Sequence, residues 1–252
     1  MKKKNQPLSR SALFCEGIMN QEKFHIQLED RIIKGVLHLL PTSAPAVVTC
    51  HGLFSSMQSE KFLHVAEVFS RVGFAVVRFD FGGCGESTGS IADTTVSRRL
   101  QELEAVMQHI SGHAKLTGHY GILGSSLGGY VGLLYAARHP VDALSVWATP
   151  KELLSLQHNI PADDLQKLKA DFFSDAGRWN LPAEIAALQF VQVIQGTEDE
   201  LVPWQHAELM NQILQEPKEL LLLPGADHRI SQPQHRKLAT AQSLAWFKKH
   251  LL

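Results

Sequence analysis

The sequence predicts an α/β protein whose central sheet is mostly parallel, and three observations support this fold class. Short apolar runs typical of buried strands alternate with segments whose apolar residues recur at helical spacing, which places helices on both faces of the sheet. Residues 24–29 and 32–40 flank Glu29-Asp30 and predict an antiparallel hairpin at the N-terminal edge of the sheet. The third observation is a glycine-rich junction between a strand and a helix at 124–128.

The other elements follow in chain order. Strands are expected at 46–50, 74–80, 119–123, 143–148, 190–196 and 220–223, and helices near 59–72, 94–110, 129–138 and 237–251. Residues 151–187 interrupt the alternation with short helical segments separated by Pro161, Gly177 and Pro182. An insertion at this point is expected to lie over the carboxyl ends of the strands as a small helical cap. With no repeat or linker in the sequence, we expect one domain over 1–252.

Composition excludes several function classes. A chain of 252 residues with 44% hydrophobic residues is long enough for one substantial core. A net charge of −1 gives no bulk field for nucleic acid or an anionic membrane, and no apolar run is long enough for a secretory leader or a membrane span. Cys15, Cys50 and Cys84 have neither metal nor disulfide spacing. We therefore expect a cytoplasmic monomer or homodimer without metal or cofactor.

The junction at 124–128 carries the candidate nucleophile. Gly124-Ser125-Ser126-Leu127-Gly128 is a G-x-S-x-G pattern between a strand and a helix, which is typical of a nucleophile elbow. In this turn the central serine is exposed above the sheet, with the N-terminus of the following helix directed at the site. Ser126 occupies the central position, and Ser125 is its nearest rival.

The acid and the base follow in the order that such sites use. Asp199 lies in the loop after the strand at 190–196, and His228 lies just beyond the last strand. Serine needs a base because its hydroxyl is a weak nucleophile, and the acid orients the imidazole of that base. Three neighbouring acids compete with Asp199 for this role: Glu198, Glu200 and Asp227. Each of the three also fits an ordinary solvated carboxylate with no catalytic role.

An earlier loop supplies the electrophilic side of the predicted site. The strand at 46–50 ends at His51-Gly52, and acyl transfer needs two backbone N–H donors directed at the developing oxyanion. Leu127 N–H and Leu53 N–H are the candidates, with Phe54 as an alternative to Leu53. His51 is expected to brace the loop.

The glycine-rich segment 79–89 is a structural loop in this interpretation. It lacks both the lysine of a phosphate-binding loop and the G-x-G-x-x-G spacing of a dinucleotide site. Asp80 is expected to hold the loop by accepting backbone hydrogen bonds.

Together these segments resemble the α/β-hydrolase superfamily, and more narrowly the serine aminopeptidase-like and cinnamoyl (feruloyl) esterase-like bacterial hydrolases. The matching blocks run in family order over residues 24–252: H-G-L-F-S-S at 51–56, F-D-F-G-G-C-G-E-S-T-G at 79–89, G-S-S-L-G-G at 124–129, G-T-E-D-E-L-V-P at 196–203 and G-A-D-H at 225–228. Two positions depart from the pattern. Ser125 stands where many relatives carry His, and Cys84 stands where His or a similar residue is frequent.

The resemblance implies an α/β-hydrolase fold and a serine-dependent hydrolase of small to medium carboxylic esters. The implied catalytic residues are Ser126, His228 and Asp199, and the candidate lining of the substrate pocket is Phe54, Leu153, Phe172, Phe173 and Trp179. Each cap aromatic also fits a purely structural role in packing the cap onto the core. A thioesterase, an amidase or an acyltransferase would use the same residues, and a non-catalytic binding protein on this scaffold is a further alternative.

Overall fold

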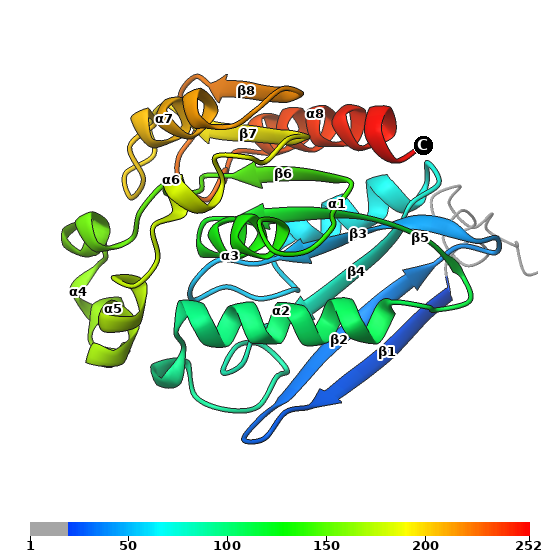
Figure 1. Ribbon diagram of the computed structural model, residues 1–252, viewed down its shortest axis with the longest axis horizontal. Coiled ribbons are helices and arrows are strands. Elements are labelled where there is room, and N and C mark those ends of the chain that lie inside the picture. Colours follow the sequence, from blue (N-terminus) through cyan, green and yellow to red (C-terminus); the bar gives the residue numbers. More distant parts are fainter. Residues whose placement is uncertain (1–19) are drawn as a thin grey trace, which may run out of the picture.

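The computed structural model describes residues 20–252, so Cys15 and the start of the predicted domain lie outside the described residues. Figure 1 shows a central sheet with helices on both sides. The strands are β1 Asn20–Gln27, β2 Ile32–Leu39, β3 Ala44–Cys50, β4 Ala75–Asp80, β5 Leu116–Ser125, β6 Ala143–Trp147, β7 Val191–Gly196 and β8 Lys218–Leu223. The α-helices are α1 Glu60–Ser70, α2 Val96–Ile110, α3 Leu127–Ala136, α4 Ala162–Leu165, α5 Ala170–Ala176, α6 Leu181–Glu184, α7 Gln205–Ile213 and α8 Pro233–Leu251, and the 3-10 helices are η1 Ile91–Asp93 and η2 Leu154–Asn159.

The sheet confirms the predicted fold class. Its eight strands are ordered β1-β2-β4-β3-β5-β6-β7-β8. β2 is antiparallel to both β1 and β4, whereas all pairs from β4 to β8 are parallel. The predicted hairpin is present and closes with Gln27 opposite Ile32. Because β3, β5, β7 and β8 run in the same direction, the loops that follow them meet at one edge of the sheet.

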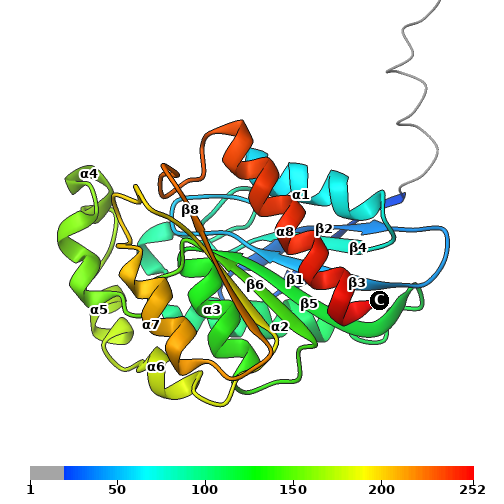
Figure 2. The same cartoon turned by 90° about the horizontal axis from the view of Figure 1, so that it is seen from above.

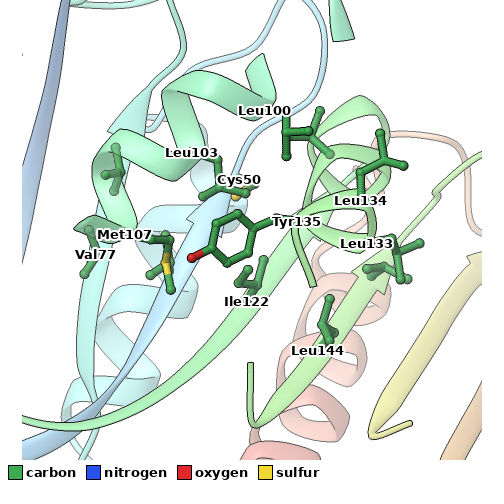
Figure 3. Packing of buried hydrophobic residues seen from close by; sticks show 14 of the residues in the cluster. Cys50, Val77, Leu100, Leu103, Met107, Ile122, Leu133, Leu134, Tyr135 and Leu144 are labelled. Atoms are coloured by element: carbon green, nitrogen blue, oxygen red, sulfur yellow. The ribbon is translucent and has the colours of Figure 1, made fainter. Parts of the chain in front are cut away.

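Helices cover the two faces in separate groups. Figures 1 and 2 show α2 and α3 on one face and α1 and α8 on the other. Two buried apolar clusters match this division, one including residues of α2, α3 and α7 and the other including residues of α1 and α8. Figure 3 shows the first cluster, where Leu103 and Met107 of α2 and Leu134 of α3 pack over Ile122 and Cys50 of the sheet. Both faces of the central parallel strands β3, β4, β6 and β7 are therefore buried, which explains why these strands are mainly apolar.

Helix ends follow local chemistry. Thr95 caps α2, because its side-chain oxygen accepts a hydrogen bond from Arg98 N. The last helix starts at Pro233, four residues before the predicted start at 237. Proline suits the first turn because it lacks only an N–H that has no helical partner there. Among residues 20–252, no helix combines the length and the apolar character needed to cross a membrane.

The segment 151–187 forms η2, α4, α5 and α6, in agreement with the expected short helices. Figure 1 shows α4 and α5 beyond the arrowheads of β6 and β7, on the side where the parallel strands end. Several polar contacts tie this segment to the rest of the fold, including one to α2 and one to the loop after β7. Asp175 Oδ2 accepts from Ser97 N at 2.9 Å, and Asn159 Nδ2 donates to Leu201 O at 2.8 Å. The second contact links the segment to the loop after β7.

Candidate active site

Ser126 lies in the sharp turn between β5 and α3. Its backbone has φ 55° and ψ −125°, a conformation that non-glycine residues rarely adopt. Ser126 N donates to Trp147 O at 2.8 Å, which ties the strained turn to β6. A Cβ on Gly128 would lie 2.1 Å from Cys50 O, so only glycine allows α3 to begin this close to β3. The strain is thus held in place by the surrounding backbone.

His228 approaches Ser126 from the loop after β8. Its Nε2 lies 3.1 Å from Ser126 Oγ, and its side chain is largely buried. His228 N donates to Glu200 Oε2 at 3.1 Å, which anchors the histidine loop to the loop after β7. The imidazole is therefore held within hydrogen-bond distance of the serine hydroxyl.

Asp199 completes the hydrogen-bonded series. Its Oδ2 lies 2.9 Å from His228 Nδ1, and its side chain has no exposed surface. Three further donors satisfy the carboxylate: Leu201 N at 2.9 Å, Val202 N at 2.7 Å and Gln195 Nε2 at 2.8 Å. With every lone pair engaged, the carboxylate is fixed against the imidazole.

The rival carboxylates occupy other positions. Glu200 accepts the backbone N–H of His228, and Asp227 accepts Ser231 N at 2.7 Å. Of the acids named above, only Asp199 has a described hydrogen bond to the imidazole Nδ1. Ser125 Oγ accepts from Lys61 Nζ at 2.9 Å, whereas Ser126 Oγ lies next to His228.

The loop after β3 faces the same serine. A Cβ on Gly52 would lie 3.2 Å from Ser126 Cβ, so the backbone approaches the serine closely. Within residues 20–252, neither Leu53 N–H nor Leu127 N–H has a protein acceptor. Phe54 in this loop has φ 55°, a second strained non-glycine residue beside the site. Two free amides next to Ser126 are the arrangement that an oxyanion would need.

His51 braces this loop as predicted. Its Nε2 accepts from Phe81 N at 3.0 Å, and its Nδ1 lies 2.8 Å from Gly52 O. Complete burial lowers the pKa of His51 to about 3, with Arg99 lowering it further, so the ring is neutral at pH 7. A neutral ring that accepts at Nε2 donates at Nδ1, which fixes the orientation of the Gly52 peptide.

Arg99 of α2 contacts the peptide groups of His51 and Gly52 through its guanidinium. It is completely buried, and its Nη1 lies 3.4 Å from His51 O and 3.3 Å from Gly52 O. Its other contacts are Thr94 Oγ1 at 2.9 Å, Cys84 Sγ at 3.6 Å and the ring of Phe81, whose centroid is 4.6 Å from Cζ. Sequence reasoning does not identify Arg99, although its place on the apolar face of α2, between Val96 and Leu100, is a detectable signal.

Asp80 holds the glycine-rich segment, again as predicted. Its carboxylate accepts from Met57 N at 2.7 Å and from Glu86 N at 2.8 Å. Ser87 Oγ donates to Asp80 O at 2.6 Å. The Asp80 side chain therefore joins the loop after β3 to the loop after β4. These bonds hold the loop after β3, which faces Ser126, in its position.

A cavity of about 440 Å³ opens at this edge of the sheet. Ser126 and His228 line it together with Gly52, Leu53 and Leu127. One wall is apolar and comes largely from the cap: Pro150, Leu153, Leu156, Ile160, Pro161 and Phe172. Another wall carries charged side chains, among them Lys61, Arg229 and Arg236. Sequence reasoning does not single out these three cations. Arg229 alone has a detectable signal, because it directly follows His228.

The predicted pocket aromatics separate into two groups. Phe54, Phe172 and Leu153 line the cavity, whereas Phe173 and Trp179 are not among its lining residues, which corrects that part of the prediction. Phe173 is partly buried against the core and meets Phe172 edge to face. Trp179 faces α2 instead, lining a separate hollow, with the Arg138 guanidinium 5.0 Å from its ring centroid. Adjacent positions on a short helix point in different directions, so composition alone does not decide which aromatic meets the substrate.

Metal-ligand clusters are also missing from the described part of the chain. No group of three or more His, Cys, Asp or Glu side chains within residues 20–252 is arranged to hold an ion.

Comparison with known families supports the same fold. A family model described as "alpha/beta hydrolase fold" matches residues 45–179, and the model of the prolyl oligopeptidase family matches residues 170–252. The mitochondrial palmitoyl-protein thioesterase ABHD10 of Mus musculus is 25% identical over 223 residues, which are 77% of this chain and 72% of that protein.

Solved structures give the same result. Est1E from Butyrivibrio proteoclasticus with ferulic acid bound has a TM-score of 0.81 at 20% identity, covering 90% of this chain and 98% of that one. The esterase domain of a Rhodothermus marinus protein has a TM-score of 0.73 at 20% identity, covering 93% of this chain and 100% of that one. At such identities the likeness establishes the fold.

Proposed function

The chain belongs to the α/β hydrolase family, and from this premise we propose that it is a serine hydrolase of small to medium carboxylic esters. The single observation that carries the proposal is the hydrogen-bonded series Asp199–His228–Ser126 at a cavity. Nucleophile, base and orienting acid within hydrogen-bond reach are the recognised signature of acyl transfer.

The proposed reaction begins with Ser126. Its Oγ attacks the ester carbonyl carbon while His228 Nε2 takes the hydroxyl proton, and a tetrahedral intermediate forms. Collapse of this intermediate breaks the bond to the leaving oxygen, which receives the proton from His228 and departs as an alcohol. Water then attacks the acyl-enzyme, again losing a proton to His228, and Ser126 is regenerated with release of the carboxylic acid.

Leu53 N–H and Leu127 N–H are the proposed oxyanion donors. Both lie next to Ser126 without a described protein acceptor, so charge developing on the carbonyl oxygen would meet dipoles already in place. Phe54 N–H remains the alternative to Leu53. Asp199 keeps the imidazole in the tautomer that accepts the serine proton.

The apolar wall is the proposed acyl site, and the segment 151–187 is its cap. Leu153, Leu156 and Phe172 line the cavity from this segment. Ligand sites of about 300–1,000 Å³ usually accommodate drug-sized molecules, and this cavity of about 440 Å³ lies in that range. These features favour a small to medium ester.

Thioester hydrolysis is the second candidate. The Mus musculus relative is a palmitoyl-protein thioesterase by name, and a thioester would use the same nucleophile, base and oxyanion donors. Matched oxygen and sulfur esters with the same acyl group separate the two candidates by their kcat/KM values.

The test combines labelling with kinetics. A fluorophosphonate probe should label the folded protein at Ser126, since the Oγ–P bond forms as fluoride leaves and His228 takes the proton. Turnover of nitrophenyl esters from acetate to long chain, with methyl ferulate added, should fall about 10⁴-fold or more in Ser126→Ala. Ser43→Ala, which changes an exposed serine in the turn before β3, is the control and should keep both labelling and turnover. Full esterase activity in Ser126→Ala would refute the proposal.

A further inference from the structure

Lys61 is a cation on the cavity wall that the proposed mechanism does not use. It stands at the start of α1, is partly buried and lines the cavity. Its Nζ donates to Ser125 Oγ at 2.9 Å, one residue from the candidate nucleophile. An ammonium group has three donors, and within residues 20–252 this is the only hydrogen bond that Lys61 Nζ makes. No described carboxylate lies within ion-pair distance of it.

Arg229 is a second such cation. It directly follows His228, is exposed and lines the same cavity. Arg229 forms no ion pair and no side-chain hydrogen bond in the part of the chain that the structure describes. Its guanidinium is therefore available to a ligand with planar anionic oxygens.

The neighbouring acids are already engaged. Glu60 is bonded to Arg236, whose Nη2 also donates to Ser231 O at 2.8 Å. Asp164, on the cap side of the cavity, pairs with Lys167 at 2.6 Å. Asp227 accepts Ser231 N at 2.7 Å. Within residues 20–252, Lys61 and Arg229 therefore form no ion pair, although the Asp227 carboxylate is close enough to favour the charged form of Lys61.

The protonation state of Lys61 supports its role as a cation. Burial lowers its pKa to about 8, with Asp227 opposing the shift and with Arg229 and Arg236 adding to it. Lys61 is thus mostly protonated at pH 7. An anion bound between these cations would relieve their mutual repulsion and supply the missing acceptors.

Resting on the proposed function, we propose that Lys61 and Arg229 form an anion-binding subsite that recognises a carboxylate on the leaving group of the ester. We place this subsite on the leaving-group side because Arg229 directly follows His228 in the sequence, and His228 delivers the proton to the leaving oxygen. The apolar lining residues come largely from the cap, whereas Lys61 comes from α1 and Arg229 from the loop after β8, so we place the acyl group against the cap. The natural substrate is therefore an ester that joins an apolar acyl group to a carboxylate-bearing alcohol.

Two matched ester pairs test the subsite. The first pair is the butanoate ester of a hydroxynitrobenzoic acid and the same compound with its carboxyl group blocked as the methyl ester. The second pair carries the charge on the acyl group instead, as nitrophenyl hydrogen glutarate and nitrophenyl pentanoate. We expect kcat/KM for the first pair to favour the anionic member about tenfold, through KM, and to lose this preference at high salt. The second pair should show no preference for its anionic member.

The variants are Lys61→Gln, Arg229→Gln and the double variant. Each should lower the anionic-to-neutral ratio of the first pair, and the double variant should bring it near one. Both kcat/KM values in this ratio are measured on the same protein, so a general loss of activity or of folded protein lowers both equally and leaves the ratio unchanged. Arg229→Gln changes an exposed side chain and keeps the test valid if Lys61→Gln misfolds. Lys237→Gln, an exposed lysine of α8 outside the cavity lining, removes one charge as the control and should keep the ratio.

The outcomes separate this inference from the proposed function. If Ser126-dependent hydrolysis occurs without a preference for the anionic leaving group, the subsite is refuted and the serine hydrolase stands. If the preference appears in the glutarate pair instead, the placement on the leaving-group side is wrong. If neither pair is hydrolysed in a Ser126-dependent manner, the proposed function itself fails.

Discussion

The floor of the candidate site and the cap above it are built differently. The floor, which comprises the loops after β3, β5, β7 and β8, is held by buried side chains with several hydrogen bonds each, such as Asp199 and Arg99. The cap, residues 151–187, consists of short helices whose polar contacts with the body are exposed or only part-buried, such as Lys169 with Asp93 and Arg138 with Glu184, and Leu154 in it is 46% exposed. The candidate reacting groups are therefore fixed by more buried hydrogen bonds than the cap, which is the less constrained part of the candidate pocket.

Substitution of Asp199 tests the floor most strongly. Asp199→Asn keeps the shape of the side chain but presents an amide to His228 Nδ1, which favours the wrong imidazole tautomer. We expect kcat to fall about 10⁴-fold with little change in KM. Steady-state kinetics on nitrophenyl butanoate measures the effect, with Glu198→Gln as the control. A loss of less than tenfold would remove Asp199 from the proposed triad.

The next largest effect is expected from Arg99, a positioning residue. Arg99→Met keeps an unbranched apolar stem but removes the guanidinium that donates to His51 O and Gly52 O, so the proposed oxyanion donor at Leu53 loses its support. We expect kcat to fall about 100-fold, as for loss of an oxyanion donor, with KM nearly unchanged.

Arg99→Lys serves as the partial rescue in this experiment, because it restores a cation near the carbonyls. Thermal unfolding of each variant separates a folding defect from a local one. An Arg99→Met variant that is destabilised but retains full kcat per folded molecule would assign Arg99 a purely structural role.

Two adjacent aromatics sharpen the interpretation of the cap. Phe172 lines the cavity and Phe173 does not, although both lie on α5 and their rings touch. Phe172→Leu should change the ratio of kcat/KM between short and medium acyl chains by about tenfold, since a change in pocket volume is worth one to a few kcal/mol. Phe173→Leu is the matched control and should leave this ratio unchanged. Equal shifts in both variants would contradict the assigned wall.

The last prediction concerns stability rather than activity, namely the pH dependence of folding that the buried His51 imposes. Burial lowers the pKa of His51 from 6.5 to about 3, so below pH 6.5 the unfolded chain binds a proton that the folded protein does not. Stability is therefore complete above pH 6.5 and decreases towards pH 3, by about 1.4 kcal/mol per pH unit from this group. Buried His38, whose pKa is lowered to about 4 chiefly by burial, adds a similar slope down to that pH.

Urea unfolding between pH 8 and pH 4 measures this slope. His51→Gln should be less stable at pH 8 but should lose less stability on acidification, because the variant lacks one of the histidines that burial keeps neutral in the folded protein. A variant with the wild-type slope would show that His51 is not the source of the acid sensitivity.

Much of the fold is predictable because its signals are local. Apolar runs and helical spacing place nearly every strand and helix, and the elbow sequence around Ser126 is read directly from the chain. Asp199 and His228 are also predictable, since both follow strands whose carboxyl ends meet. Arg99 and Lys61 are different, because their partners lie 47 and 64 residues away and no local pattern marks them.

The amino-acid sequence by itself determined the α/β architecture, the order of the candidate nucleophile, acid and base, and the identity of the loop opposite them. These follow from periodicity and from motifs, which depend on residues close together in the chain. Only the tertiary structure decided that Phe172 rather than Trp179 faces the cavity, that Arg99 supports the Gly52 peptide, and that Lys61 and Arg229 line the cavity of Ser126 with no ion pair to any described residue. Those facts depend on side-chain direction and on charge balance between distant segments, which exist only once the chain is folded.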